Sequence, residues 1–239
     1  IDAGKLALTE HYARLGYEAE VEYTGIFIMY RMRLKLKSQP LVKILIPNKD
    51  QEETLANCLS SIYEKTDYPY FEIIVVENNS EKEETFAYYE KMKQEHENFH
   101  VVTYQGGFNY SAINNFGVRH AKGEYLLFVD SDDYLEKNAC QKLYEHAKLH
   151  DNDLVLFGRY NLREGGETEK LYLPVVEDFS LREYKEEMAR LSPFPWDKLI
   201  RRELFQEIGG FPEGIRFEDL PVAHMLAVSA RKIGVVSEC

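Results

Sequence analysis

The chain has 239 residues, of which 44% are hydrophobic, and this is enough for one large or two small folded domains, which excludes a disordered chain. Its 29 Lys and Arg residues against 41 Asp and Glu residues give a net charge of -12, so we expect no nucleic-acid partner. No apolar run approaches the roughly 20 residues that cross a bilayer, so the sequence predicts no transmembrane segment.

The first 40 residues differ in pattern from the rest. A helical stretch, "AGKLALTEHYARLG", precedes "AEVEYTGIFIMYRMRLKLK", in which apolar residues recur at every second position. We interpret residues 1–40 as a linker or appendage from a preceding module. The chain starts without Met and stops directly after a predicted strand, and we therefore expect it to be a piece of a longer protein.

From residue 42 onward, strands and helices alternate. Short β-branched runs at 42–47, 72–77, 100–104 and 125–130 are predicted strands, and the helical patterns between them cover 53–65, 83–96 and 110–120. This alternation predicts βαβ units, hence an α/β fold whose central sheet is mainly parallel and flanked by helices.

Past these units the pattern loosens. We expect a helix over about 137–150, a strand over 153–160, a proline-broken loop "SPFPWDKL" leading into a short helix, and a last helix in the second half of "IRFEDLPVAHMLAVSARK". Cys58 and Cys140 fall in predicted helices, and with Cys239 they form no CxxC pair, which favours reduced thiols and a cytoplasmic location.

Three predicted strands end in polar side chains: "PNKD" at 47–50, "ENNS" at 77–80 and "DSDD" at 130–133. Ligands of open parallel sheets bind beyond the carboxyl ends of the strands. We therefore expect these three segments to meet in one cleft.

The "DSDD" segment has two interpretations. Asp130 and Asp132 lie on the same side of an extended segment and can hold a hard divalent cation, which normally shares its remaining sites with substrate phosphates. The alternative is a strand end followed by the start of a helix, and in both interpretations we expect Asp133 to cap that helix. Because neither a GxGxxG segment after the first strand nor a GxxxxGK[ST] segment is present, a metal is the best candidate for holding phosphate.

Two further features could carry chemistry. Glu218 and Asp219 stand before the last helix, where a half-buried carboxylate could act as a general base, or where acids could simply complement the helix dipole. Trp196 is the only tryptophan and could be an apolar wall for a sugar ring or a structural anchor. The seven histidines form no HExxH or similar pattern, so we expect each to have a surface or core role.

Several of these motifs follow one another as in a known family. "VKILIPNKDQEETLANCLSSIYEKTDYPYFEIIVVENNS", then "NYSAINNFGVRHAKGEYLLFVDSDDYLEKNA", then "WDKLIRRELFQEIGGFPEGIRFEDLPVAHML" resemble bacterial family 2 glycosyltransferases with the GT-A fold. The resemblance covers roughly residues 40–236. It implies a glycosyltransferase domain at 41–239, with a nucleotide-binding half at 41–135 and an acceptor half at 136–239.

The resemblance also implies roles for individual residues. Asp219 would be the catalytic base assisted by Glu218, and Asp130 and Asp132 would bind Mg²⁺ or Mn²⁺. Trp196 and Lys198 would lie near the donor sugar or the acceptor. The residues expected to bind the nucleotide are Pro47, Asn48, Asp50, Glu77, Asn78, Asn115, Asp130 and Ser131.

The implied reaction is an inverting, metal-dependent transfer from a nucleotide-diphosphate sugar to a surface polysaccharide or glycoconjugate, with a saccharide or a lipid-linked acceptor. Where many relatives have "YN" and "DD", this chain has "NK" at 48–49 and "EN" at 77–78, so UDP and dTDP both remain open as donors. Residues 1–40 resemble the linker in multi-module enzymes of rhamnan-type polysaccharide synthesis, which implies neighbouring modules and a cytoplasmic location, with peripheral attachment at the inner face of the cell membrane as the alternative. The other reading is a nucleotide-sugar-binding or partner-binding module that is inactive in isolation.

Overall fold

The structure is a computed structural model that describes residues 2–14, 18–25, 29–35, 41–162, 168–170 and 178–237. The chain forms two compact units, Ile1–Gln39 and Pro40–Cys239. Among the described residues, no helix is both long and apolar enough to cross a bilayer.

The described part of the first unit contains one helix and one hairpin. Helix α1 (Asp2–Arg14) precedes strands β1 (Glu18–Tyr23) and β2 (Tyr30–Lys35), which pair antiparallel in register from Glu18 with Lys35 to Tyr23 with Tyr30. These elements occupy the helical and alternating segments of the sequence. A role of this unit as a linker between modules stays a prediction.

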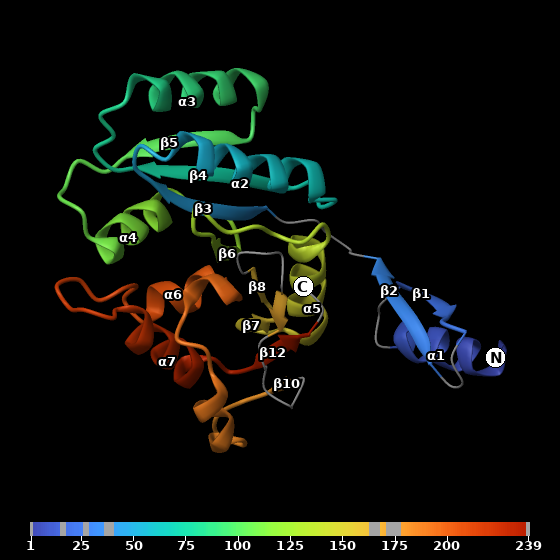
Figure 1. Cartoon of the computed structure of the whole chain (residues 1–239). Coiled ribbons are helices and arrows are strands. Elements are labelled where there is room, and N and C mark those ends of the chain that lie inside the picture. The colour runs from blue at the N-terminus through green and yellow to red at the C-terminus, as the bar shows by residue number, and fades with distance from the viewer. Residues whose placement is uncertain are drawn as a thin grey trace. The chain divides into compact units, whose positions relative to one another are not determined.

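Among the described residues, the second unit is built on an eight-stranded sheet in the order β10-β12-β7-β11-β6-β3-β4-β5. Figure 1 labels most of these strands. The strands are β3 (Val42–Asn48), β4 (Phe71–Glu77), β5 (Phe99–Thr103), β6 (Tyr125–Phe128), β7 (Leu154–Phe157), β10 (Asp178–Phe179), β11 (Lys198–Arg201) and β12 (Ile233–Val236). A separate hairpin pairs β8 (Tyr160–Leu162) with β9 (Thr168–Lys170).

Most of the sheet is parallel. Strand β3 runs parallel to β4 and β6, β4 runs parallel to β5, and β12 runs parallel to β7. Strand β11 pairs antiparallel with both β6 and β7, and β10 pairs antiparallel with β12. The predicted α/β fold with a mainly parallel sheet is therefore confirmed, whereas β11, inserted between β6 and β7, was not anticipated.

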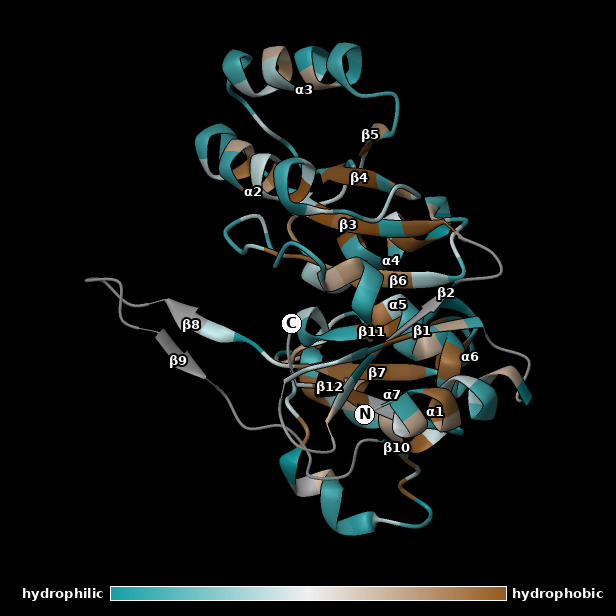
Figure 2. Cartoon of the chain, turned by 90° about the vertical axis from the view of Figure 1, so that its right-hand side faces the viewer, coloured by the Kyte–Doolittle hydropathy of each residue, from teal (hydrophilic) through white to brown (hydrophobic). Residues whose placement is uncertain are grey.

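Helices accompany the strands as the alternation predicts. They are α2 (Glu52–Lys65), α3 (Glu83–Glu95), α4 (Tyr110–His120), α5 (Ala139–His150), α6 (Arg202–Glu207) and α7 (Asp219–Ser229), with 3-10 turns at Lys185–Arg190 and Pro195–Asp197. Helix α4 packs on β3 and β4, and α5 packs on β7 and β12. A buried apolar cluster joins α4, α6 and α7 to the strands through residues such as Leu45, Phe128 and Leu226. In Figure 2 the central strands β3, β4 and β7 are mainly hydrophobic, as strands covered on both faces must be.

The prediction that Asp133 caps the helix after β6 is wrong. The backbone N–H of Asp133 donates to the carbonyl of Asp130 at 3.0 Å, so these residues form a turn. Helix α5 begins only at Ala139, with Asn138 at the capping position. The sequence of acids therefore ends a strand and does not start a helix.

Candidate active site

Three strand ends meet at the carboxyl edge of the parallel sheet. Asn48 at the end of β3 pairs in register with Glu77 at the end of β4. The backbone N–H of Val129 donates to the carbonyl of Leu45 at 3.2 Å, which sets Asp130 beside the same edge. The "PNKD", "ENNS" and "DSDD" segments therefore lie together, as parallel pairing requires.

Acids from distant parts of the chain gather at this edge. Burial, followed by the charge of Asp132 and then that of Asp219, raises the pKa of Asp130 to about 6, while the hydrogen bond from Tyr110 opposes this shift. Asp219 is the first residue of α7, so its charge reaches a strand end far away in the sequence. We call Asp130, Asp132, Asp133 and Asp219 the carboxylate cluster.

The other members of the cluster differ in exposure. Burial, followed by the charges of Asp130 and Asp132, raises the pKa of Asp133 to about 6, while the guanidinium of Arg159 opposes this shift. Asp132 is exposed. Half-buried Asp130 and exposed Asp132 offer carboxylate oxygens, which are the ligand atoms that Mg²⁺ and Mn²⁺ prefer.

Asp219 has the environment of a proton acceptor. Burial, and then the charge of Glu218, raises its pKa to about 6, whereas the charge of Lys198 lowers it. Its Oδ1 atom is buried and receives no hydrogen bond from the residues that the structure describes. A carboxylate with a raised pKa and an unused oxygen can accept a proton near neutral pH.

The loop before Asp219 is conformationally strained. Phe217 has φ of 59°, in the left-handed region that non-glycine residues rarely adopt, and its side chain is 82% exposed. Its carbonyl accepts the backbone N–H of Leu220 at 3.3 Å. This turn starts α7 with Asp219 and leaves an aromatic ring in solvent beside it.

Lys198 is held by protein groups. Its side chain is fully buried, and its Nζ donates to the carbonyls of Ser192 at 2.8 Å and Phe194 at 2.6 Å and to Oδ1 of Asp197 at 2.5 Å. The Nζ atom of Lys198 is thus occupied by protein groups, and a position of Lys198 near the donor sugar or the acceptor stays a prediction. Its described effect on the site is through charge, on Asp219.

Trp196 belongs to an aromatic stack. Its ring lies parallel to that of Phe194 with centroids 4.9 Å apart, and the guanidinium of Arg159 lies 4.4 Å from its centroid. Arg159 also pairs with Asp197 at 2.6 Å. The half-buried tryptophan is thus anchored, as the structural interpretation predicted, and a contact with the donor or acceptor stays a prediction.

The nucleotide-side residues at the ends of β3 and β4 are tied to each other. Glu77 is buried and accepts from Ser80 N at 2.6 Å, Ser80 Oγ at 2.5 Å and the hydroxyl of Tyr89 at 3.0 Å. Buried Asn48 donates through Nδ2 to the same hydroxyl at 2.8 Å. Both side chains therefore shape the loop after β4 from beneath it.

The loop itself is fixed by Asp50 and Asn78. Asp50 accepts the backbone N–H groups of Glu81 and Lys82 at 2.7 and 3.0 Å. Asn78 donates through Nδ2 to the carbonyls of Tyr104 at 3.1 Å and Gly106 at 3.0 Å. Because both amide hydrogens of Asn78 are used, Oδ1 is the side-chain atom left to accept a hydrogen bond.

Asn115 connects α4 to the chain that follows α6. Its Nδ2 donates to the carbonyl of Phe211 at 2.8 Å and to Glu213 at 3.4 Å, and its Oδ1 accepts the N–H of Phe211 at 2.8 Å. Gly210 has φ of 75°, and a Cβ there would lie 2.5 Å from Oδ1 of Asn115. The amide thus holds a loop close to α4.

Two residues of the site were not singled out in the sequence. The hydroxyl of Tyr110 donates to Oδ1 of Asp130 at 3.4 Å, and burial followed by the charges of Asp130 and Asp219 raises its pKa. Arg159 places a cation near Asp133. Tyr110 lies within the "NYSAIN" segment quoted above. The local sequence around Tyr110 and around Arg159 contains no signal that marks either of them as a site residue. Pro47 and Ser131 are half-buried at the same edge.

The mainly parallel sheet flanked by helices, with acids at the carboxyl ends of its strands, has the GT-A fold of nucleotide-sugar transferases, which solved structures share. Residues 1–349 of TarS from S. aureus, in complex with UDP-GlcNAc, superpose with a TM-score of 0.69 at 24% identity, covering 83% of this chain and 56% of that one. The mannosyltransferase PcManGT from Pyrobaculum calidifontis, in complex with GDP-Man and Mn²⁺, gives a TM-score of 0.63 at 16% identity, covering 99% of this chain and 63% of that one.

The sequence comparisons identify the family. The profile of glycosyl transferase family 2 matches residues 43–214, so the chain belongs to that family. The O-antigen biosynthesis protein RfbC of Myxococcus xanthus is 31% identical over 98% of this chain, which corresponds to only 19% of the length of RfbC.

Proposed function

We propose that the chain is the catalytic domain of an inverting, metal-dependent glycosyltransferase that uses UDP- or dTDP-sugar and acts in the synthesis of a surface polysaccharide or glycoconjugate. The observation that carries the proposal is the proximity of Asp130 and Asp219, two acids from opposite halves of the domain that each have a pKa near 6. Membership of glycosyl transferase family 2 supports the reaction class.

In this mechanism, Asp219 takes the proton from the acceptor hydroxyl. Its raised pKa suits this task, because the carboxylate is ionised at neutral pH yet basic enough to bind a proton. Glu218 assists by keeping that pKa high. The oxygen freed of its proton attacks the anomeric carbon opposite the leaving group, and this single displacement inverts the configuration.

Asp130 and Asp132 would hold Mg²⁺ or Mn²⁺, and Asp133 contributes to the negative charge around them. When bound, the cation would neutralise charge on the departing nucleoside diphosphate. Tyr110 orients Asp130 through its hydroxyl. PcManGT, one of the structures of similar fold, binds Mn²⁺ together with its nucleotide sugar, which supports a divalent cation here.

The base of the nucleotide is assigned to the edge formed by Pro47, Asn48, Asp50, Glu77 and Asn78. Oδ1 of Asn78 would accept the ring N–H that uracil and thymine share, which is why this residue alone does not choose between UDP and dTDP. TarS, of similar fold, binds UDP-GlcNAc, which favours UDP. Asn115 is assigned a positioning role, since the Phe211 backbone uses both ends of its amide.

An Asp219→Asn variant tests the assignment of the base. We expect this variant to lose two activities: the transfer of sugar to an acceptor, and the slow hydrolysis of UDP- or dTDP-sugar. Its metal-dependent affinity for UDP should be unchanged. Asp197→Asn is unsuitable as a control because Asp197 pairs with buried Lys198, so Glu207→Gln, on exposed α6 surface, serves instead. Equal turnover by Asp219→Asn and the parent chain would refute the proposed base.

The alternative function is a module that binds a nucleotide sugar or a partner without turnover. Absence of Asp219-dependent hydrolysis in the parent chain, with metal-dependent nucleotide binding intact, would favour it. Three expectations stay predictions from the sequence. They are a saccharide or lipid-linked acceptor, the presence of neighbouring modules in a longer chain, and a cytoplasmic or peripheral membrane location.

A further inference from the structure

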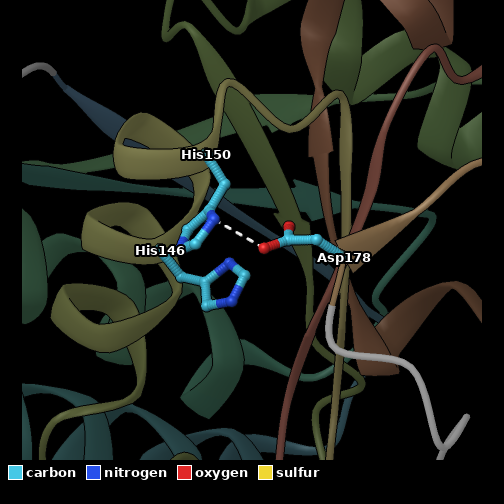
Figure 3. A group of neighbouring side chains, drawn as sticks. All are labelled: His146, His150 and Asp178. Atoms are coloured by element: carbon cyan, nitrogen blue, oxygen red, sulfur yellow. Dashed lines mark ion pairs between the residues drawn. The ribbon is translucent and has the colours of Figure 1, made fainter.

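Two histidines and one aspartate meet far from the carboxylate cluster. His146 and His150 lie one turn apart near the end of α5, and Asp178 opens the edge strand β10. Figure 3 shows the three side chains pointing toward one another from these two elements. One ligand atom from each lies within 4.8 Å of the others. We call these three residues the His-Asp group.

The His-Asp group lies at the opposite edge of the sheet from the carboxylate cluster. Asp178 pairs with Gly234 near the start of β12, and Gly234 pairs with Val155 near the start of β7. Strand β7 runs in the same direction as β6, because β11 is antiparallel to both. The His-Asp group is therefore at the amino ends of these strands, whereas Asp130 follows the carboxyl end of β6.

A buried amide orients two of the three side chains. Oδ1 of Asn152 lies 3.0 Å from Nδ1 of His146, and Nδ2 of Asn152 donates to Oδ1 of Asp178 at 2.9 Å. Asn152 is fully buried, so its position is fixed. Side chains that hold metal ligands in place by hydrogen bonds are a usual part of metal sites.

The rings themselves are closely packed. Those of His146 and His150 stack with centroids 4.5 Å apart, and Nδ1 of His150 lies 2.5 Å from Oδ2 of Asp178. A Cβ at Gly234 would lie 2.7 Å from Cε1 of His146, so the glycine lets that ring rest against β12. The side chains of His150 and Asp178 are 33% and 20% exposed, which leaves the group within reach of a small solute.

From this arrangement we propose that His146, His150 and Asp178 form a second, separate metal site, which takes a transition-metal dication of the Zn²⁺ type. Two imidazoles and one carboxylate, with water as the fourth ligand, are a donor set for tetrahedral Zn²⁺, whereas Mg²⁺ prefers oxygen alone. Ligand atoms of such a site are about 3.3 Å apart, so His150 and Asp178 separate slightly on binding and His146 draws closer. The ion ties the two-residue strand β10 to α5.

Binding of Co²⁺ and Zn²⁺ to the chelator-treated chain tests the site. Co²⁺ is followed by its visible absorption, which is strong in four-coordinate sites, and Zn²⁺ by competition with a chromophoric chelator. The parent chain should bind one equivalent of Co²⁺ that shows the strong four-coordinate absorption, and His146→Gln, His150→Gln and Asp178→Asn should each weaken this binding about tenfold or more. His120→Gln, the same change at the exposed end of α4, should keep this four-coordinate signal, and so should Asp132→Ala, because Asp132 belongs to the carboxylate cluster.

Circular dichroism melts accompany each variant. Added Zn²⁺ should raise the melting temperature of the parent chain and of Asp132→Ala but not that of His146→Gln. If His150→Gln does not fold, His146→Gln carries the comparison, because the His146 ring contacts the amide of Asn152 and forms no ion pair with any residue that the structure describes. Equal Zn²⁺ affinity in His146→Gln and the parent chain, or loss of the four-coordinate Co²⁺ spectrum in Asp132→Ala alone, would overturn the proposal.

Discussion

Replacement of Asn115 by Ala separates a positioning role from a nucleotide-binding role. The amide makes two hydrogen bonds of 2.8 Å to the backbone of Phe211, whose side chain is buried. Each such bond contributes about 1 kcal/mol, and the two backbone groups of Phe211 would then need new partners, so we expect a loss of about 1–3 kcal/mol in the free energy of unfolding. For a domain of this size, the melting temperature should fall by about 2–4 °C for each kcal/mol.

Thermal melts and calorimetric titration with UDP give the two readouts. Asn115→Ala should lose stability and keep the UDP affinity of the parent chain under conditions where it is folded. Glu213→Gln is the matched control, since it alters only the 3.4 Å contact and should change stability by less than about 0.5 kcal/mol. Gly210→Ala should destabilise in the same direction, because its Cβ would meet Oδ1 of Asn115. A stable Asn115→Ala variant that no longer binds UDP would refute the reasoning.

Three further results are expected. Without divalent cations, the free energy of unfolding should rise by about 1–2 kcal/mol as pH falls from about 8 to about 5.5. The reason is that the raised pKa values in the carboxylate cluster make its charge destabilising above pH 6, and each proton that binds reduces the repulsion among the remaining carboxylates. Asp130→Asn should flatten this pH dependence in melts at several pH values, and parallel curves for the variant and the parent would contradict the prediction. Although burial alone would raise the pKa of Asp153, the hydrogen bonds and charge of Arg231 hold that pKa below its usual range. The resulting stabilisation is present above the pKa of the unfolded chain and is lost as pH falls through the pKa of the folded chain. Asp153→Asn should therefore lower the free energy of unfolding at pH 7 by about 2–3 kcal/mol in urea titrations, and an unchanged midpoint would count against this network. Phe217→Gly should leave the free energy of unfolding unchanged or up to about 1 kcal/mol higher, since glycine adopts positive φ freely. The same variant should raise the KM for the acceptor, whereas Phe217→Tyr, which keeps an aromatic ring, should not raise it. Equal KM values for Phe217→Gly and the parent chain would show that the exposed ring has no part in acceptor binding.

Local patterns predicted the strands and helices that alternate. The expected helix at residues 110–120 matches α4, because Tyr110 to His120 has a clear apolar face and no proline. Strand β11 was missed because its four residues follow a proline-rich turn and pair with β6 and β7 only through tertiary structure. The cap assigned to Asp133 failed because "DSDD" could equally end a strand in a turn.

The candidate site was predictable in part. The order of polar strand ends placed Asn48, Glu77 and Asp130 at one edge, which parallel register alone enforces. The sequence could not predict that the amides and carboxylates of the nucleotide side form hydrogen bonds with backbone groups, since these groups lie in other loops. The same holds for His146 and His150, whose spacing of four residues is visible in the sequence, whereas their partner Asp178 is supplied only by the pairing of β10 with β12.

Calorimetric titration of UDP in the presence and absence of Mn²⁺ tests the central claim, that the carboxylate cluster binds a nucleotide diphosphate through a divalent cation. The parent chain should bind UDP with Mn²⁺ and much more weakly without it, and Asp132→Ala, which removes an exposed carboxylate and leaves the fold intact, should abolish the metal-dependent part. An Asp132→Ala variant whose UDP affinity responds to Mn²⁺ as the parent's does would contradict the account.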